Sequence, residues 1–241
     1  QAEASAQVVN AWTVYTKRDI RSYETLDQFE AAGWMQARFL PQMLLIDPSG
    51  IDWDKEKEYE RLKDCVEAGI NLVFLKLPDV SVVDAHPGLK ELLGITQVRQ
   101  EQTTVSGLHL FKGFLLGGEM LYKEETQSGI QDLELTFPWY TLGVGTKIYM
   151  RGMIEDERPG VIDYPAVIWR KGCGTAFVFA VNGGYLEDAA GLGILSAMAA
   201  EMSPYEIYPV VNAQNMVFVN YPGMAAENDD VIRSRYNQPL P

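Results

Sequence analysis

The sequence predicts an α/β fold: a three-layer sandwich in which helices cover both faces of a mainly parallel sheet, with an antiparallel hairpin late in the chain. Two patterns lead to this prediction. The first is a strand, a helix and a strand in residues 41–79, and the second is a pair of β-rich runs around a glycine-containing turn in residues 163–182. The chain has 241 residues, of which 47% are hydrophobic, so it can bury a core of this size.

The first pattern has the elements of a βαβ unit. The apolar run 43–47 ends in Asp-Pro-Ser-Gly, which is typical of a turn that stops a strand. Residues 52–69 carry apolar side chains at helical spacing, so Cys65 is expected to face the core beside Leu62. The strand 70–76 is a nearly continuous apolar run, as in sheets covered on both faces. Two strands joined in this way are expected to be parallel.

The remaining elements follow from apolar patterns and from the residues that end them. Asp52 or Asp54 is expected to cap the helix of the βαβ unit, and Gly69 to end it. Further elements are expected as follows: a short helix at 86–95 ending at Gly94, one or two strands in 107–119, a strand in 143–152, a hairpin at 163–182, a helix at 186–202, and closing strands at 205–212 and 215–221. We expect residues 1–221 to form one domain and residues 222–241 a tail or linker.

Composition and missing motifs exclude several classes of function. The chain has 20 basic and 33 acidic residues, a net charge of -13, and no basic stripe, so nucleic acids and anionic membranes are not expected partners. No apolar run approaches the roughly 20 residues that span a bilayer, so no direct membrane insertion is expected. The sequence has no metal-binding motif and no phosphate-binding glycine loop, so we expect neither a metal nor a cofactor.

Cys173 lies between two glycines, which fits either a nucleophile on a sharp turn or the tip of a hairpin. A hydrolase-class enzyme would pair it with His86 or His109, the two histidines of the chain. A hairpin tip offers no helix N-terminus to stabilise a thiolate, so the turn interpretation is favoured. The chain's other cysteine is Cys65, and we expect both to be free thiols.

Polar residues at strand ends are candidates for a ligand site. Asp47, Asp79 and Glu119 follow predicted strands, and the turn from Asn182 to Tyr185 follows another. In an open parallel sheet, ligands bind beyond the carboxyl ends of the strands. The alternative is that these side chains only cap helices and close turns.

Three carboxylates at such an edge would favour a neutral polyol or a cation over an anion. A sugar fits, since its hydroxyl groups can bond to the carboxylates and its apolar face can lie on Tyr185 or Trp139.

The order of these segments resembles the class I glutamine amidotransferase-like fold, a three-layer flavodoxin-like sandwich. The segments that carry the resemblance are "MLLIDPSGID", "EAGINLVFLKLPD" and "PAVIWRKGCGTAFVFAVNGG". The likeness is greatest to divergent branches such as the trehalose-utilisation-like proteins. The sequence is also similar to a bacterial domain of unknown function found in envelope proteins beside polysaccharide-deacetylase-like barrels.

The sequence departs from the catalytic members of that fold where their catalytic residues would lie. The nucleophilic cysteine would fall on Leu77 or Pro78. The histidine and glutamate would follow the strand "TAFVFAV", where this chain has Asn182, Gly183, Gly184 and Tyr185. The resemblance therefore implies a non-catalytic accessory or ligand-binding module of a larger bacterial cell-envelope protein, with polysaccharide as the material it would handle. The implied partners are a carbohydrate or other domains of the same polypeptide. An extracytoplasmic location is expected, with a cytoplasmic one as the alternative.

Overall fold

The computed structural model describes residues 2–34, 40–115, 118–126, 129–154, 164–183 and 190–203. The chain divides into two compact units, residues 1–207 and 208–241, and every described residue belongs to the first. In chain order the elements are α1 Ala2–Thr16, α2 Leu26–Ala31, β1 Met43–Ile46, the short 3-10 helix η2 Pro48–Gly50, α3 Glu56–Glu67, β2 Asn71–Phe74, α4 Val80–Ala85, α5 Pro87–Leu93, β3 Ile95–Val105, β4 Gly107–Leu110, β5 Met120–Tyr122, β6 Glu124–Thr126, β7 Gly129–Gln131, β8 Leu135–Leu142, β9 Thr146–Met153, β10 Ala166–Cys173, β11 Ala176–Val181 and α6 Ala190–Met202.

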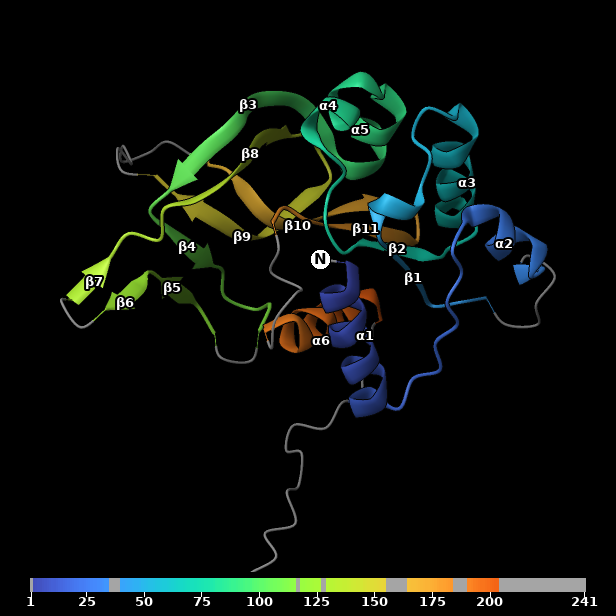
Figure 1. The fold of residues 1–241 in the computed structure, drawn as a ribbon, viewed down its shortest axis with the longest axis horizontal. Coiled ribbons are helices and arrows are strands. Elements are labelled where there is room, and N and C mark those ends of the chain that lie inside the picture. The colour runs from blue at the N-terminus through green and yellow to red at the C-terminus, as the bar shows by residue number, and fades with distance from the viewer. Residues whose placement is uncertain are drawn as a thin grey trace, which may run out of the picture. The chain divides into compact units, whose positions relative to one another are not determined.

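In the described part of the chain, seven strands form the central sheet, in the order β1-β2-β11-β10-β9-β4-β5 (Figure 1). β1, β2 and β11 pair in parallel, and the remaining neighbours pair antiparallel. As a result β1, β2, β11, β9 and β5 all run in one direction, although direct parallel pairing is confined to the first three. The predicted α/β fold is confirmed. The strands predicted at 43–47 and 70–76 are β1 and β2, and they are parallel neighbours.

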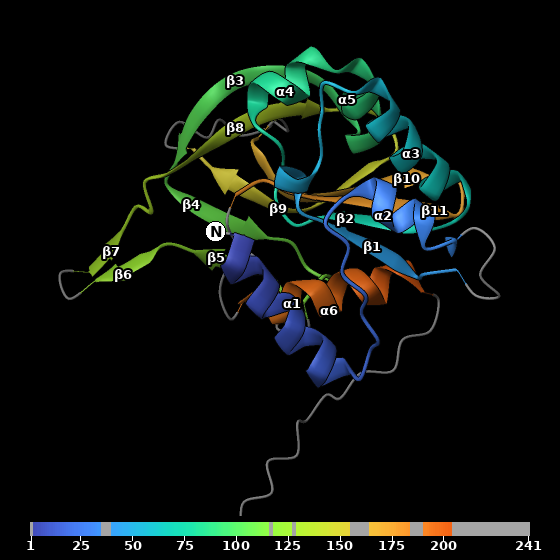
Figure 2. The ribbon, with the colours of Figure 1, turned by 45° about the vertical axis from the view of Figure 1, so that its right-hand side comes forward.

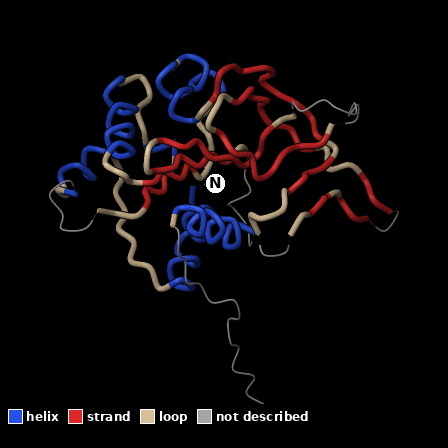
Figure 3. Tube along the Cα trace, turned by 180° about the vertical axis from the view of Figure 1, so that it is seen from behind, coloured by secondary structure: helices blue, strands red, loops and turns tan. Residues whose placement is uncertain are grey.

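Helices cover both faces of this sheet, as Figures 1 and 3 show. α3, α4 and α5 lie on one face, where β3 and β8 form a separate antiparallel pair, and α1 and α6 lie on the other. No described helix is long and apolar enough to cross a membrane.

The central strands are buried on both sides because alternate side chains enter different cores. Val73 and Phe179 pack with the α1 and α6 side, whereas Leu72 and Val178 pack with the α3 and α5 side.

The hairpin predicted at 163–182 is confirmed as β10 and β11, with Gly174 in the left-handed region at its tip. The short helix predicted at 86–95 is α5, and Gly94 ends it with a left-handed C-cap. The helix predicted at 186–202 is described from Ala190 onward as α6. The predicted strands at 205–212 and 215–221 and the tail at 222–241 lie outside the described residues.

The prediction that Asp52 or Asp54 caps the helix of the βαβ unit is wrong. α3 begins later, at Glu56, and the residue before it, Lys55, makes no side-chain capping bond. Asp52 instead forms an ion pair with Lys55, with 3.0 Å between the carboxylate and Nζ. The other features of this helix agree with the prediction, since Cys65 is buried and the chain turns at Gly69 with positive φ.

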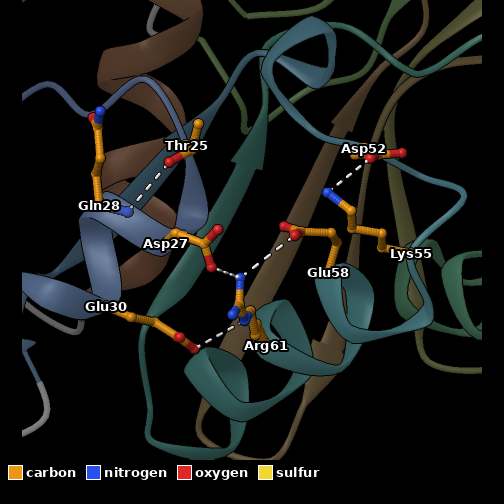
Figure 4. Close-up of polar contacts among 8 residues, drawn as sticks. All are labelled: Thr25, Asp27, Gln28, Glu30, Asp52, Lys55, Glu58 and Arg61. Carbon is orange, nitrogen blue, oxygen red and sulfur yellow. Dashed lines mark hydrogen bonds and ion pairs between the residues drawn. The ribbon is translucent and has the colours of Figure 1, made fainter.

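Arg61 ties α2 to α3 (Figure 4). Its guanidinium lies 2.6 Å from the carboxylate of Asp27 and 3.2 Å from that of Glu30, both on α2, and 3.4 Å from Glu58 on α3 itself. Thr25 caps α2 by accepting a hydrogen bond from the Gln28 backbone. The charged contacts fix the position of a helix of only six residues, which would not be stable alone.

Glu201 joins α6 to the antiparallel part of the sheet. It accepts hydrogen bonds from the Tyr149 hydroxyl and from Lys147 Nζ at 3.0 Å, and Arg170 lies 3.4 Å away. Burial alone would raise the pKa of Glu201, but the bonds from Tyr149 and Lys147 and the charges of Lys147 and Arg170 outweigh it and lower the pKa. Burial and the bond to Glu201 raise the pKa of Tyr149.

Replacing Glu201 with glutamine is expected to lower the free energy of unfolding at neutral pH by about 1 kcal/mol. Because the pKa of Glu201 is lower in the folded state than its ordinary value of 4.5, its contribution is present above that value. The contribution is lost as the pH falls through the folded-state pKa. Urea unfolding should therefore separate Glu201→Gln from the wild type at pH ~7 but not at pH ~2. An equal difference at both pH values would contradict the assigned role.

Candidate functional site

The parallel strands β1, β2 and β11 end at one edge of the sheet, which we call the carboxyl edge. Asp47 directly follows β1, Lys76 and Asp79 follow β2, and Asn182 directly follows β11. Three of the predicted site residues, Asp47, Asp79 and Asn182, thus follow neighbouring parallel strands. This is the edge at which open α/β sheets form their ligand crevices.

Asp47 supports the chain turn after β1. Its carboxylate accepts hydrogen bonds from the Ser49 backbone at 3.0 Å and from the Ser49 hydroxyl at 2.7 Å, and Lys76 Nζ lies 3.6 Å away. Burial would raise the pKa of Asp47, but the bonds from Ser49 and the charge of Lys76 prevail and lower it. Asp47 is therefore an ionised capping residue, which agrees with the alternative interpretation from the sequence.

An aromatic side chain that sequence reasoning missed lies beside this turn. The indole Nε1–H of Trp53 donates a 3.1 Å hydrogen bond to the carbonyl of Pro48, and its ring stacks on Phe74. Trp53 is half-buried, so part of its surface remains open. The residues between β1 and Trp53 form a turn and lack any strand pattern. The sequence therefore did not indicate that Trp53 lies at the end of β1.

Asp79 differs from Asp47 because its carboxylate makes no structural hydrogen bond or ion pair with the described residues. It occupies the N-cap position of α4 but makes no side-chain capping bond, and it is exposed. Within the described parts of the chain its carboxylate has no hydrogen-bond or ion-pair partner. An acidic side chain that neither caps nor pairs is available to a ligand.

Tyr140 on β8 supplies a hydroxyl group that sequence reasoning did not identify. Its side chain is 1% exposed, and its hydroxyl has no hydrogen-bond partner among the described residues. Burial raises the pKa of Tyr140, and the negative charge of Asp79 raises it further. Burying an unpaired hydroxyl costs free energy, so this group is a candidate for a bond to a ligand or to water.

Asn182 is engaged in the fold. It is 2% exposed, and its side-chain nitrogen donates to the carbonyls of Pro138 at 2.7 Å and Ala166 at 3.0 Å. Both donor hydrogens are therefore used to hold β8 and β10 against the end of β11. Tyr185, predicted in the same turn, lies outside the described residues. Trp139, the other predicted stacking surface, is 6% exposed and covered by Arg99, whose guanidinium lies 4.2 Å from the ring centroid.

Glu119 lies elsewhere, so the expectation that it joins the carboxyl edge is wrong. It precedes β5, which is separated from β11 by β10, β9 and β4. Its carboxylate lies 2.6 Å from His109 Nε2, and Arg151 Nε donates to His109 Nδ1 at 3.3 Å. Because Arg151 occupies the Nδ1 lone pair, the Nε2–H donates to Glu119. Both nitrogens of His109 are thus in use.

Cys173 lies at the opposite edge of the sheet from Asn182. It pairs with Ala176 at the start of β11, whereas Asn182 follows the end of that strand. A strand of this length separates the two by about 20 Å. His109 lies opposite Arg151, which pairs with Ala166 at the far end of β10 from Cys173. No hydrogen bond joins Cys173 to either histidine in the part of the chain that the structure describes.

Both cysteines are free, as predicted. Burial raises the pKa of Cys173, Lys171 partly offsets this, and Glu91 adds to it. Burial also raises the pKa of Cys65 to about 12. Neither thiol is therefore a thiolate near neutral pH. Among the described residues no group of three or more His, Cys, Asp or Glu side chains is arranged to hold a metal ion.

No protein-family model matches the sequence, and no curated protein matches it. The solved structures that match this chain include the following three. A cytoplasmic protein from Salmonella typhimurium has a TM-score of 0.45 at 10% identity, over 83% of this chain and 86% of that one. A ThuA-like protein from Bacteroides uniformis has a TM-score of 0.38 at 11% identity, over 81% and 84%. An exo-β-1,4-mannosidase from an Opitutaceae bacterium has a TM-score of 0.35 at 15% identity, over 61% of this chain.

The chain spans 22% of the length of the mannosidase. The structural neighbours thus include a ThuA-like protein, at a low TM-score and low identity. At these identities the likeness concerns the α/β arrangement alone.

Proposed function

We propose that this chain is a non-catalytic binding module whose ligand, a neutral sugar or polyol, docks at the carboxyl edge. The observation that carries the proposal is the exposed carboxylate of Asp79, which has no partner in the described fold and acts electrostatically on the unpaired hydroxyl of Tyr140. A carboxylate accepts hydrogen bonds from sugar hydroxyl groups, and the half-buried Trp53 offers an aromatic surface at the same edge.

The charge at this edge also favours a neutral ligand. Lys76 neutralises Asp47, so Asp79 is the carboxylate left without a counter-charge among the described residues of this edge. An anionic ligand would be repelled by that carboxylate, whereas hydroxyl groups would donate to it.

A non-catalytic role is supported by the state of the thiols and of His109. Cys173 is protonated and lies at the opposite edge of the sheet, and His109 has both ring nitrogens occupied. A nucleophile with an adjacent base is the arrangement that covalent hydrolysis needs. The cysteine-dependent hydrolase considered from the sequence therefore gains no support from the geometry.

The wider setting that we propose is a larger bacterial cell-envelope protein that handles polysaccharide outside the cytoplasm. This part of the proposal rests on the resemblance of the sequence. The complete reading frame of the gene would test it, since a signal peptide and a deacetylase-like barrel are expected on either side of this region. A reading frame without either feature would contradict it.

Binding is expected to depend on Asp79. The experiment is a screen of neutral oligosaccharides on an array, followed by calorimetric titration of the wild type, Asp79→Asn and Asp84→Asn. Asp84 is the matched control, because it is an exposed carboxylate on the same helix that pairs with Lys90 at 3.0 Å. Asparagine keeps an acceptor oxygen but removes the charge that strengthens the hydrogen bond, so Asp79→Asn should bind about tenfold more weakly, and Asp84→Asn should bind as the wild type does.

Both variants should unfold at the wild-type temperature, because Asp79 makes no capping bond and the Asp84 ion pair is exposed. Equal affinity in the wild type and Asp79→Asn would remove the carboxyl edge as the binding site. Absence of binding to any neutral oligosaccharide would overturn the proposed ligand class.

A further inference from the structure

β5 is an edge strand whose apolar side chains are exposed. Among the described strands it pairs with β4 on one side and has no neighbour on the other (Figure 2). Its residues, Met120, Leu121 and Tyr122, are 50%, 66% and 56% exposed. An exposed apolar edge strand is a template for pairing with another strand. The strand at the other edge of the sheet, β1, differs, because each of its side chains is half-buried or buried.

The residues around β5 have a charge pattern that is complementary to itself. Glu119 precedes the strand and Lys123 follows it, with Leu121 at the centre. If two such segments pair antiparallel about Leu121, each Glu119 lies opposite the Lys123 of the other copy. Met120 then lies opposite Tyr122, and Leu121 opposite itself. Antiparallel pairing about a two-fold axis makes every contact occur twice.

We propose that two copies of this chain associate through β5, extending the central sheet across a two-fold axis. The backbone groups on the open side of β5 would form the ladder, and the apolar side chains would be covered by their counterparts. The two Glu119–Lys123 pairs would select the antiparallel register, because opposite charges directly across a ladder stabilise it and like charges oppose it. This association is independent of the ligand site at the carboxyl edge.

Glu119 and Lys123 remain accessible to a second copy of the chain, although each already contacts a residue of opposite or basic character within its own chain. Glu119 lies 2.6 Å from His109 and is 55% exposed, and Lys123 lies 2.8 Å from Asp132 and is 37% exposed. They lie on the same face of the strand, two positions from Leu121 on either side. The interface is short, and each copy carries a net charge of -13. We therefore expect a weak dimer with a dissociation constant in the micromolar range, at the small end of specific interfaces.

The test is sedimentation equilibrium of the full chain over a range of concentrations, with charge reversals at the two positions. Glu119→Lys and Lys123→Glu should each weaken dimerisation about tenfold, because two symmetry-related pairs become repulsive. The double variant should restore wild-type dimerisation, since each introduced lysine would again face an introduced glutamate of the other copy.

The double variant separates this inference from effects within one chain. It places a lysine beside His109 and a glutamate beside Asp132, so it cannot repair the contacts that the single variants break. Leu121→Lys supplies a second measure and should also shift the equilibrium to monomer. A wild type that stays monomeric at all concentrations would overturn the proposal. A double variant that dimerises as weakly as the single ones would overturn it too.

Discussion

Trp169→Ala is expected to lower the free energy of unfolding by about 3–5 kcal/mol, the largest effect of any single substitution discussed. Trp169 lies in β10, in the middle of the central sheet, and is 0% exposed. Its ring packs in the core beneath α3 and α5, with the Tyr140 ring centroid 6.3 Å away. Alanine would leave a cavity that the surrounding strands cannot close, because each is fixed by its ladder.

The same tryptophan also joins a strand to a helix end. Its indole Nε1–H donates a 2.8 Å hydrogen bond to the carbonyl of Leu93, the last residue of α5. Trp169→Phe keeps most of the buried ring but leaves that carbonyl unpaired, so a loss of about 1–3 kcal/mol is expected. Denaturant unfolding followed by circular dichroism measures both variants. An alanine variant within about 1 kcal/mol of the wild type, or one no less stable than the phenylalanine variant, would contradict this account.

Asn182→Ala is expected to lower the free energy of unfolding by about 2–4 kcal/mol, because it leaves one buried and one partly buried carbonyl group without their donor. These are the carbonyls of Pro138 and Ala166, on β8 and β10. The bonds hold two strands of different sheets against the end of β11. Thermal or denaturant unfolding measures the loss.

Asn182→Asp is the matched control, because it keeps the side-chain shape and removes the donor. At neutral pH it should be at least as destabilising as alanine, since a buried carboxylate would face two carbonyl oxygens. The loss in its free energy of unfolding, relative to the wild type, should become smaller at acidic pH, where the protonated acid can donate one hydrogen bond. A residue used only for ligand contact would give the opposite result, with stability retained and binding lost.

The tertiary structure explains why some elements were not predicted. β3 is an 11-residue strand with mostly exposed polar side chains, so it has no apolar alternation for a sequence pattern to reveal. Its partner is β8, which is distant in sequence, and the pair is irregular in register. Strand formation here depends on cross-strand pairing rather than on burial. α1 was missed for a related reason, because its stability comes from packing against α6.

Local patterns were sufficient for the βαβ unit, the late hairpin and the burial of Cys65, because each depends on residues close in sequence. The ends of β1, β2 and β11 were likewise predictable as places for Asp47, Asp79 and Asn182. Which of these side chains is free was not predictable. The buried amide bonds of Asn182 and the unpaired Tyr140 hydroxyl depend on atoms brought together from distant segments.

The sequence by itself determined the α/β class and the strand ends, since hydrophobic periodicity and turn residues act over a few neighbouring positions. Only the tertiary structure decided that Glu119 lies by His109, away from the carboxyl edge. The physical reason is strand order. Placing β10, β9 and β4 between β11 and β5 separates residues that a simple parallel sheet would bring together, and no local propensity encodes that order.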